Sequence, residues 1–572
     1  MSISAPYILG IWDGHDAGAA VLHDGRILAA VNEERLTRRK LEIGFPRQSV
    51  ACCLDVAGVR ADDIAGVALS TWDVAKTLTR FAPVLRNQYY ALRRRRMPPT
   101  MFSRLKKYSK YLLTLVPGGA ATRALGACLV RRDLRACGVA APLHWLAHHE
   151  AHAAAAALCS GFVEATVLTL DGIGDSISGS VSVWRAPRLE HIANMRGRDS
   201  LGIFFEHVTN LMNMRELEDE GKVMALANYA LPVPDAHNPM LTWFSCDDLT
   251  VRCRFGPLRL HHALAQLLYQ VPSEQFAFMA QRTLEVFVTR LVRDAVAHTG
   301  IPAVCLAGGV ASNVKVNMLV RELDCVRDVF VFPHMGDGGL AVGAALALGN
   351  RLYQWPGAAL DDVFLGPECA DGKMAEALAA AHCEYARMEA PWEIAADALA
   401  HGETVLWFDG RMEFGPRALG HRSILTRADD PALRDRLNLQ LKQRVWYQPF
   451  CPSILAADAP RLLENYRGPN RFMTEAYRTT TEGRHVLVAA ISIDGTCRPQ
   501  IVDVRDGAYA KLLQAVRARI GVGAVLNTSM NIHGDPMVNT PAEAVDVFLR
   551  SGADMLVLGP FVARARHLRN DE

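Results

Sequence analysis

The 572-residue sequence lacks the features that mark membrane, secreted and disulfide-rich proteins. No run of about 18 apolar residues occurs, so no membrane-spanning helix is expected. Residues 1–18 contain no basic segment ahead of an apolar one, which argues against a signal peptide. The thirteen cysteines include no C-x-x-C pair, and this favours reduced thiols over a disulfide framework or a zinc ribbon. We therefore expect a cytoplasmic protein.

The chain also has little net charge. Its 62 Lys and Arg residues against 60 Asp and Glu residues give +2, so nucleic acid is not an expected partner. Half of the residues are hydrophobic and 21% are charged, which is typical of a globular protein. The length exceeds that of one hydrophobic core and predicts two or more domains.

One segment departs from this balance of charge. Between Asp73 and Asp133 the chain has fourteen Lys or Arg residues and no Asp or Glu. The aromatic residues interleaved with these cations are Tyr89, Tyr90, Phe102, Tyr108 and Tyr111. A solvated surface insertion is one interpretation. An acidic substrate or partner, or the surface of an anionic membrane, is another, because each rewards clustered cations.

Three glycine-rich turns follow predicted strands. Residues 7–37 alternate like two strands joined by a turn at 23–25, and residues 165–185 repeat a strand–turn–strand unit. Residues 303–323 predict a strand, a Gly-Gly turn and a helix beginning near Ser312, where backbone N–H groups can receive an anion. This order matches the phosphate and adenosine elements of the actin-like ATPase fold. A turn-rich stretch at 354–373 then predicts a linker.

Histidines are concentrated in the sequence "LAHHEAH". On a helix, His148 and His152 project from one side, and His149 with His152 is the competing register. Asp171 and Asp337, each followed by glycine, are candidates to complete a metal site. Such ligands suit Fe(II), Mn(II) or Zn(II), although packing or capping histidines are an alternative interpretation.

Cations and neutral donors are concentrated after residue 400. "GPRALGHRSIL" predicts a helix beginning at Pro416, with Arg417 and Arg422 near an N-terminus that favours anions. Lys442 and Arg444 follow. A polar strand-to-turn segment then contributes Asn527, Thr528, Ser529 and Asn531. Together these groups suit a small, doubly charged phosphate compound.

Six motifs resemble one enzyme family across almost the whole chain. In order they are "HDAGAAVLHDGRILAAVNEERLTRRK", "HHEAHAAAA", "GKVMALA", "LAGGVASNVKVN", "GPRALGHRSIL" and "NTSMN" followed by "GDP". They resemble the carbamoyltransferase family that includes nodulation protein U, the cephalosporin carbamoyltransferases and the aminoglycoside O-carbamoyltransferases. The histidine motif alone also occurs in the tRNA threonylcarbamoyl transferases.

The resemblance implies an α/β enzyme of two domains. Residues 1–357, with the basic insertion at about 74–132, would form an actin-like domain similar to the tRNA threonylcarbamoyl transferases. Residues 358–572 would resemble the threonylcarbamoyl-adenylate synthase fold. Carbamoyl phosphate and ATP would give carbamoyl-adenylate, whose carbamoyl group passes to an acceptor hydroxyl of a small molecule, natural product or saccharide. The alternatives are a tRNA threonylcarbamoyl-type transferase and a non-catalytic nucleotide-binding regulator.

The family motifs also imply roles for individual residues. The groups around carbamoyl phosphate would be Arg417, Lys442, Arg444, Gln448, Arg498, Asn527, Ser529 and Asn531. The nucleotide would lie near Asp13, Lys222, Gly308, Gly309 and Asn313. The metal ligands would be His148, His152, Asp171 and Asp337, with Fe(II) favoured over Mn(II), Zn(II) and Mg(II). Catalysis would rest on His15, Lys442 and Arg417, with His15 taking the proton of the acceptor hydroxyl.

The chain departs from the family pattern at "QPFCPS". The family has arginine where this sequence has Gln448, and alanine where it has Cys451. A phosphate-binding cation is therefore missing. Arg444 or Arg422 as its replacement is a hypothesis at this point.

Overall fold

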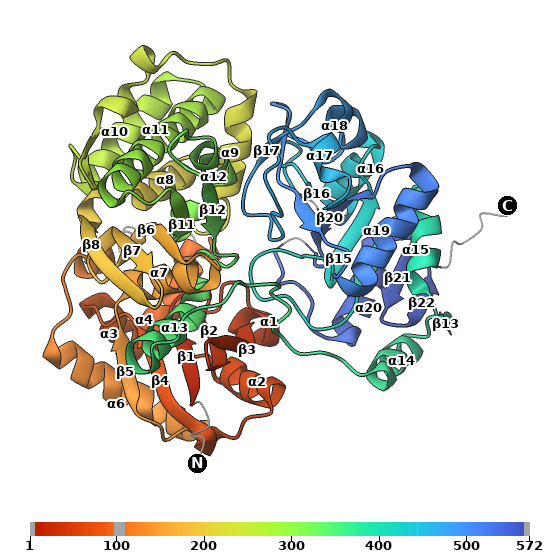
Figure 1. Ribbon diagram of the computed structural model, residues 1–572, viewed down its shortest axis with the longest axis horizontal. Coiled ribbons are helices and arrows are strands. Elements are labelled where there is room, and N and C mark those ends of the chain that lie inside the picture. The colour runs from red at the N-terminus through yellow and green to blue at the C-terminus, as the bar shows by residue number, and fades with distance from the viewer. Residues whose placement is uncertain (1–5, 97–108, 443, 533, 566–572) are drawn as a thin grey trace. The chain divides into compact units, whose positions relative to one another are not determined.

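The computed structural model describes residues 6–96, 109–442, 444–532 and 534–565 (Figure 1). The chain forms two compact units. One comprises residues 1–37 and 41–361, and the other comprises residues 38–40 and 362–572. Within the described ranges, no helix is both long and apolar enough to cross a membrane.

The first unit contains two sheets of the same design. The first sheet has the order β3-β2-β1-β4-β5, in which β1, β2 and β3 are antiparallel neighbours and β1, β4 and β5 are parallel. Its strands are β1 (Tyr7–Trp12), β2 (Gly18–His23), β3 (Arg26–Asn32), β4 (Ile64–Ser70) and β5 (Leu143–Leu146).

The second sheet repeats this pattern in the order β8-β7-β6-β11-β12. Its strands are β6 (Glu164–Gly174), β7 (Ile177–Arg185), β8 (Arg188–Arg196), β11 (Ala303–Ala307) and β12 (Asp328–Val331). The duplicated order confirms the actin-like fold expected from the two hairpin units. The expected helix after the Gly-Gly turn is α12 (Val314–Arg321).

Two helices rich in small residues separate the sheets. α13 (Leu340–Tyr353) packs on β1, β2 and β4, whereas α7 (His148–Cys159) packs on β6 and β11, and the two helices contact each other (Figure 1). Their alanines and glycines permit this close approach. A Cβ added at Gly343 would overlap the carbonyl oxygen of Ala151 on α7. The same packing fixes the direction in which the start of α7 points.

Other helices cover the outer faces of the two sheets. α2 (Arg47–Ala57) contacts β2 and β3, and α8 (Leu201–Leu211) with α11 (Ser273–Thr299) contacts β6. The basic segment forms α3 (Val74–Phe81), α4 (Pro83–Arg93) and α6 (Ala120–Ala136).

The second unit is built on an eight-stranded sheet with the order β13-β22-β21-β14-β15-β20-β16-β19. Its strands are β13 (Tyr385–Arg387), β14 (Val405–Phe408), β15 (Arg422–Arg427), β16 (Cys451–Leu455), β19 (Gln500–Val502), β20 (Ala524–Ser529), β21 (Met555–Leu558) and β22 (Phe561–Arg564).

Both faces of this sheet are covered. Leu406 and Phe408 of β14 join the core beneath α14 (Asp371–Ala380) and α20 (Pro541–Ser551). The alternate residues of the strand, Val405 and Trp407, join the core beneath α15 (Pro391–Ala400) and α19 (Gly507–Ile520). This period of two is that of a strand buried on both faces. The unit is α/β, and its likeness to the threonylcarbamoyl-adenylate synthase fold stays a prediction.

The helix predicted at Pro416 does not form. Residues 416–421 are an irregular loop, and the chain then enters strand β15 at Arg422. The apolar run "SIL" is buried in the sheet between β14 and β20, so tertiary pairing determines its conformation. Arg417 therefore lies in a loop and not at a helix N-terminus.

Candidate functional site

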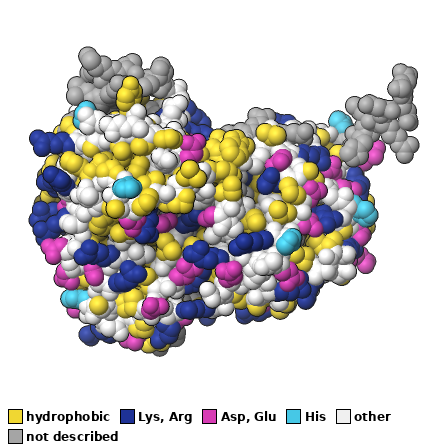
Figure 2. Space-filling view, turned by 90° about the horizontal axis from the view of Figure 1, so that it is seen from above, with side chains coloured by type: hydrophobic (Ala, Val, Ile, Leu, Met, Phe, Trp, Pro, Cys, Tyr) yellow, Lys and Arg dark blue, Asp and Glu magenta, His cyan; other side chains and the backbone are white. Residues whose placement is uncertain are grey.

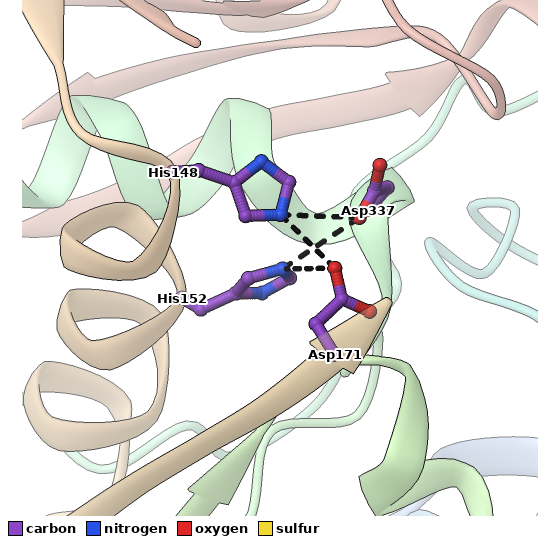
Figure 3. Close-up of side chains that lie close together, drawn as sticks. All are labelled: His148, His152, Asp171 and Asp337. Atoms are coloured by element: carbon purple, nitrogen blue, oxygen red, sulfur yellow. Dashed lines mark hydrogen bonds and ion pairs between the residues drawn. The ribbon is translucent and has the colours of Figure 1, made fainter. Parts of the chain in front are cut away.

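Four side chains of the first unit converge on one point (Figure 3). One ligand atom from each of His148, His152, Asp171 and Asp337 lies within 4.8 Å of the other three. The two histidines are one turn apart on α7, so their rings project from the same side. Asp171 lies in β6 where its pairing with β7 is interrupted, and Asp337 begins the turn that leads into α13.

Hydrogen bonds orient two members of this cluster. Thr71 Oγ1 lies 2.9 Å from Nδ1 of His148, so that Nε2 faces Oδ2 of Asp171 at 3.1 Å. The backbone N–H of Gly309 donates to Oδ1 of Asp171 at 2.8 Å. The ring of His148 and the carboxylate of Asp171 are thus each oriented by a hydrogen bond on the side away from the cluster. Outer-shell groups position metal ligands in this way.

His149 is turned away from the cluster. Its Nδ1 lies 2.7 Å from Oγ1 of Thr169, and its Nε2 lies 3.2 Å from the carbonyl oxygen of Ile177. His148 and His152 therefore form the pair beside the carboxylates, and His149 has a packing role.

The cluster fits a divalent transition metal. Nε2 of His152 is buried, has no hydrogen-bond partner among the described residues, and lies 3.8 Å from Asp171 and 3.7 Å from Asp337. Burial by itself lowers the pKa of His152, but the two neighbouring carboxylates raise it to about 9. Two imidazoles and two carboxylates with converging atoms are donors that suit Fe(II), Mn(II) or Zn(II).

His15 lies next to the cluster. Its Nε2 is 3.4 Å from Oδ2 of Asp337, and the indole N–H of Trp12 donates to its carbonyl oxygen at 2.7 Å. Burial lowers the pKa of His15 to about 4, in part opposed by Asp337 and reinforced by the charge of Arg93. The predicted proton acceptor is therefore in reach of the same space as the four ligands.

Asp13, predicted to lie near the nucleotide, is engaged by the basic segment. Arg80 donates from Nε and Nη2 to its two carboxylate oxygens at 2.7 and 3.0 Å, and Lys76 Nζ lies 2.9 Å from Oδ1. Burial raises the pKa of Asp13, but these two cations hold it well below its usual value. Helix α3 is thus tied to the loop that carries His15.

The end of α4 binds acidic residues of its own unit. Arg93 contacts Glu206 and lies 3.1 Å from Glu216, and Arg94 contacts Glu218. These cations are used inside the first unit, so they do not form the free basic surface that a membrane or partner would need. Figure 2 shows basic and acidic side chains intermixed over the face in view. Phe102, Tyr108 and the cations at 104, 106 and 107 lie outside the described residues.

The other residues predicted for the nucleotide have local roles. Gly308 has a φ of +93°, and a Cβ there would overlap the backbone of Leu170. Asn313 caps α12 and exchanges hydrogen bonds with Gln281 at 2.7 and 3.2 Å. Lys222 lies 2.8 Å from Asp219. Of the set, Gly309 contacts the four-ligand cluster directly, through Asp171.

In the second unit, Lys442 joins Ser529 and Asn531. Its ammonium group contacts the carbonyl oxygen of Ser529 and donates to the carbonyl and side-chain oxygens of Asn531 at 3.0 and 2.7 Å. Burial, with the nearby charge of Arg444, lowers the pKa of Lys442 well below its usual value. All of these acceptors are neutral.

One guanidinium group contacts Cys451, and two more act on it through their charge. Arg498 donates from Nε and Nη2 to the sulfur at 3.1 and 2.8 Å, and the charges of Arg417 and Arg444 reach the same cysteine. Burial, together with Arg498, lowers the pKa of Arg417 to about 9. Within the described residues no carboxylate pairs with these arginines or with Lys442. Lys442 is buried and the three arginines are half-buried. Cations in such surroundings without counter-charges are a ready site for an anion.

The structure separates the two candidates for the missing arginine. Arg422 is fully buried, its guanidinium carbon is 3.6 Å from the centroid of Phe408, and it donates to the carbonyls of Asp409, Gly410 and His421. Arg444 bonds Asn438 at 2.7 Å through Nε, whereas its buried Nη2 has no partner among the described atoms. Arg444, which is half-buried, therefore keeps Nη2 for a ligand. Arg422 is fully buried, uses Nη1 and Nη2 on backbone carbonyls, and keeps only Nε without a partner among the described atoms.

Asn527 lies opposite Cys451 in the pairing of β20 with β16. Its Nδ2 donates to Oγ of Ser453 at 3.0 Å and to Oε1 of Gln500 at 3.2 Å. Sequence reasoning missed Ser453 and Gln500, and it also missed Thr71 behind His148. It missed the acidic partners of α4 as well, although "ELEDE" at 216–220 is a visible counterpart to "RRRR" at 93–96.

Family comparison agrees with both units. The families described as "Carbamoyltransferase N-terminus" and "Carbamoyltransferase C-terminus" match residues 7–346 and 396–565. The chain belongs to the carbamoyltransferase family. Its members are transferases. The chain is 33% identical to nodulation protein NolNO of Sinorhizobium fredii, and the match covers 96% of this chain and 79% of that protein. Nodulation protein U of Azorhizobium caulinodans is 33% identical over 44% of this chain and 45% of its own length.

Solved structures show more distant likenesses to this carbamoyltransferase. Component A of (R)-2-hydroxyglutaryl-CoA dehydratase from Acidaminococcus fermentans is 16% identical, with 60% of this chain and 97% of that chain covered and a TM-score of 0.33. HypF from T. kodakarensis is 14% identical, with 62% of this chain and 48% of that chain covered and a TM-score of 0.32. The fold assignment rests on the sheet order and not on these likenesses.

Proposed function

We propose that this carbamoyltransferase is ATP-dependent and transfers its carbamoyl group to a hydroxyl. Carbamoyl phosphate, water and ATP give carbamoyl-adenylate, phosphate and pyrophosphate. The acceptor hydroxyl of a small molecule, natural product or saccharide then takes the carbamoyl group, and AMP leaves. The carboxylate-free cluster of Lys442, Arg417, Arg444 and Arg498 carries this proposal, because it suits a small phosphorylated substrate.

The second unit would bind carbamoyl phosphate and form the adenylate. The phosphate oxygens would accept hydrogen bonds from Arg417, from Arg498 and from the unpartnered Nη2 of Arg444. The negative charge of the phosphate would also relieve the repulsion among these arginines. The ammonium group of Lys442 contacts only neutral oxygens, those of Ser529 and Asn531. It could therefore also stabilise the negative charge that develops on the phosphate during the reaction. Asn527 and Gln448 complete the predicted set.

The first unit would perform the transfer. His148, His152, Asp171 and Asp337 would hold a divalent metal, with Fe(II) favoured and Mn(II), Zn(II) and Mg(II) as alternatives. When bound, the metal would neutralise nucleotide phosphate charge. The Gly308 and Gly309 turn would border the nucleotide.

His15 would take the proton of the acceptor hydroxyl as its oxygen attacks the carbamoyl carbon. Asp337 faces Nε2 of His15, so Nδ1 is the atom assigned to that proton. A hydroxyl is a weak nucleophile, and both proton removal and the adenylate leaving group lower the barrier.

Pyrophosphate release from the full chain tests this function. We expect release that depends on carbamoyl phosphate, ATP and added Fe(II) or Mn(II), with carbamoyl-adenylate detected by mass spectrometry. Acetyl phosphate serves as the control for the carbamoyl group. A protein that released no pyrophosphate with water or with any hydroxyl compound would disprove the proposal.

A further inference from the structure

A buried amide connects the two loops that carry His15 and Asp337. Asn32 is the last residue of β3 and is 3% exposed. Its Nδ2 donates to the carbonyl oxygen of Asp16 at 3.2 Å and to that of Gly338 at 3.3 Å. Asp16 directly follows His15, and Gly338 directly follows Asp337. One side chain therefore joins two loops that are distant in the sequence.

The partners of Asn32 determine how its amide is oriented. Carbonyl oxygens can only accept hydrogen bonds, so Nδ2 and not Oδ1 faces the two loops. Nε2 of His334 lies 3.0 Å from Oδ1, and it is the protonated ring nitrogen because an amide oxygen can only accept. The donors and the acceptor of this buried amide thus all have partners. His334 holds the amide in the orientation that both carbonyl groups require.

The two loops approach each other closely at this point. Asp16 has a φ of +56°, a left-handed conformation that residues other than glycine adopt rarely and keep only where their surroundings impose it. A Cβ added at Gly338 would overlap both the ring of His334 and Oδ2 of Asp16. Nε2 of His334 also lies 3.4 Å from Oδ2 of Asp16. The contact between the loops is therefore specific and leaves no room for a side chain at Gly338.

This contact places His15 against Asp337. Nε2 of His15 lies 3.4 Å from Oδ2 of Asp337. The other carboxylate oxygen, Oδ1, lies 3.5 Å from Nε2 of His148 and 3.7 Å from Nε2 of His152. One carboxylate thus faces His15 with one oxygen and the two histidines with the other. A shift of either loop would change both the set of converging ligand atoms and the position of His15.

We propose that Asn32 is a positioning residue of the transfer site. It fixes the turn of Asp337 for metal binding and the loop of His15 for proton transfer, and His334 supports it by fixing the amide. The inference rests on the proposed function and deepens it, because it assigns the spacing between the proposed metal site and the proposed proton acceptor to one amide.

Mn(II) affinity of the full chain, measured by isothermal titration calorimetry without nucleotide or carbamoyl phosphate, tests the proposal. Asn32→Asp keeps the volume of the side chain but turns a carboxylate oxygen toward two carbonyl oxygens. We expect it to weaken Mn(II) binding about tenfold, the size of effect of losing an outer-shell partner. At saturating Mn(II), carbamoyl transfer should still be several-fold slower, because the loop of His15 moves as well.

Asn350→Asp is the matched control. Nδ2 of Asn350 also donates to two backbone carbonyl oxygens, those of Pro187 at 2.7 Å and Trp355 at 2.9 Å. Asn350 lies near the end of α13 that is remote from Asp337. We expect this variant to lose thermal stability but to bind Mn(II) as the unaltered protein does.

Variants of His334 decide the question if Asn32→Asp does not fold. His334→Gln keeps an N–H donor for Oδ1 of Asn32 and should bind Mn(II) nearly as tightly as the unaltered protein. His334→Leu lacks that donor and should bind it about tenfold more weakly. Equal affinities for these two variants would count against the proposed role.

Unchanged Mn(II) affinity in Asn32→Asp would overturn the inference. An equal loss of affinity in Asn350→Asp would also overturn it, because a general loss of stability would then explain both results. In either case the unaltered protein still binds Mn(II), so the proposed function stands. An unaltered protein that bound no Mn(II) would instead refute the metal site of the proposed function, and the inference with it.

Discussion

The two units gather opposite kinds of side chain. In the first unit, the imidazoles of His148 and His152 meet the carboxylates of Asp171 and Asp337, so nitrogen and oxygen ligand atoms converge on one point. In the second, the buried Lys442 and the half-buried Arg498 have neutral oxygens and a sulfur as partners. The first arrangement suits a cation and the second suits an anion. Chemistry on phosphate compounds can thus use a bound metal in one unit and fixed cations in the other.

Removing a histidine from the first cluster should have the largest effect. We expect His148→Ala to lower metal affinity by more than about 100-fold, since loss of an outer-shell partner alone costs up to that much. Metal content by atomic absorption and carbamoyl transfer should fall together. His144→Ala is the matched control, because His144 lies in β5 outside the cluster. Full metal content in His148→Ala would exclude the site.

Removing the lysine from the second cluster should separate the two steps. We expect Lys442→Ala to slow pyrophosphate release by about 100-fold, the size of effect of losing one fixed donor to developing charge. Metal content should stay unchanged, because the first cluster is intact. Lys373→Ala controls for loss of a lysine. Unchanged pyrophosphate release would show that the phosphate site lies elsewhere.

The two arginines of the second unit should respond differently. Arg444→Met is expected to raise KM for carbamoyl phosphate about tenfold, because a charge-assisted hydrogen bond is lost. Arg422→Met should instead lower the free energy of unfolding by about 2 kcal/mol, since it leaves buried carbonyls without donors. Kinetics and thermal unfolding measured on both variants check this contrast. The contrast would be contradicted if the two variants changed KM for carbamoyl phosphate to the same extent and the free energy of unfolding to the same extent.

The smallest expected effect is on the pH dependence of thermal stability, through Glu220 of the first unit. Burial raises the pKa of Glu220 from 4.5 to about 8, so folding favours its protonated form. Its stabilising contribution is complete below pH 4.5 and is lost as pH rises through about 8. Glu220→Gln should therefore flatten the decline of thermal stability between pH 4.5 and about pH 8, relative to exposed Glu376→Gln. Parallel pH profiles for the two variants would refute this assignment.

Local patterns predicted much of the first unit. The two strand–turn–strand units, the Gly-Gly turn and the helix after it all appear near their expected residues, because turn chemistry and alternation act over short distances. The run after Pro416 was mistaken for a helix start. Its apolar residues suit either element, and pairing with β14 and β20 decided for a strand.

The spacing of His148 and His152 alone placed two imidazoles on one side of a helix, because residues four apart are neighbours there. Only the tertiary structure turned His149 toward Thr169 and brought one carboxylate of strand β6 and another from the turn before α13 to the pair. The same holds for the basic segment. The sequence alone shows its positive charge. The fold determined that Arg93 pairs with Glu206 whereas Lys110 lies against the ring of Tyr89, because contacts between distant residues depend on how the helices pack.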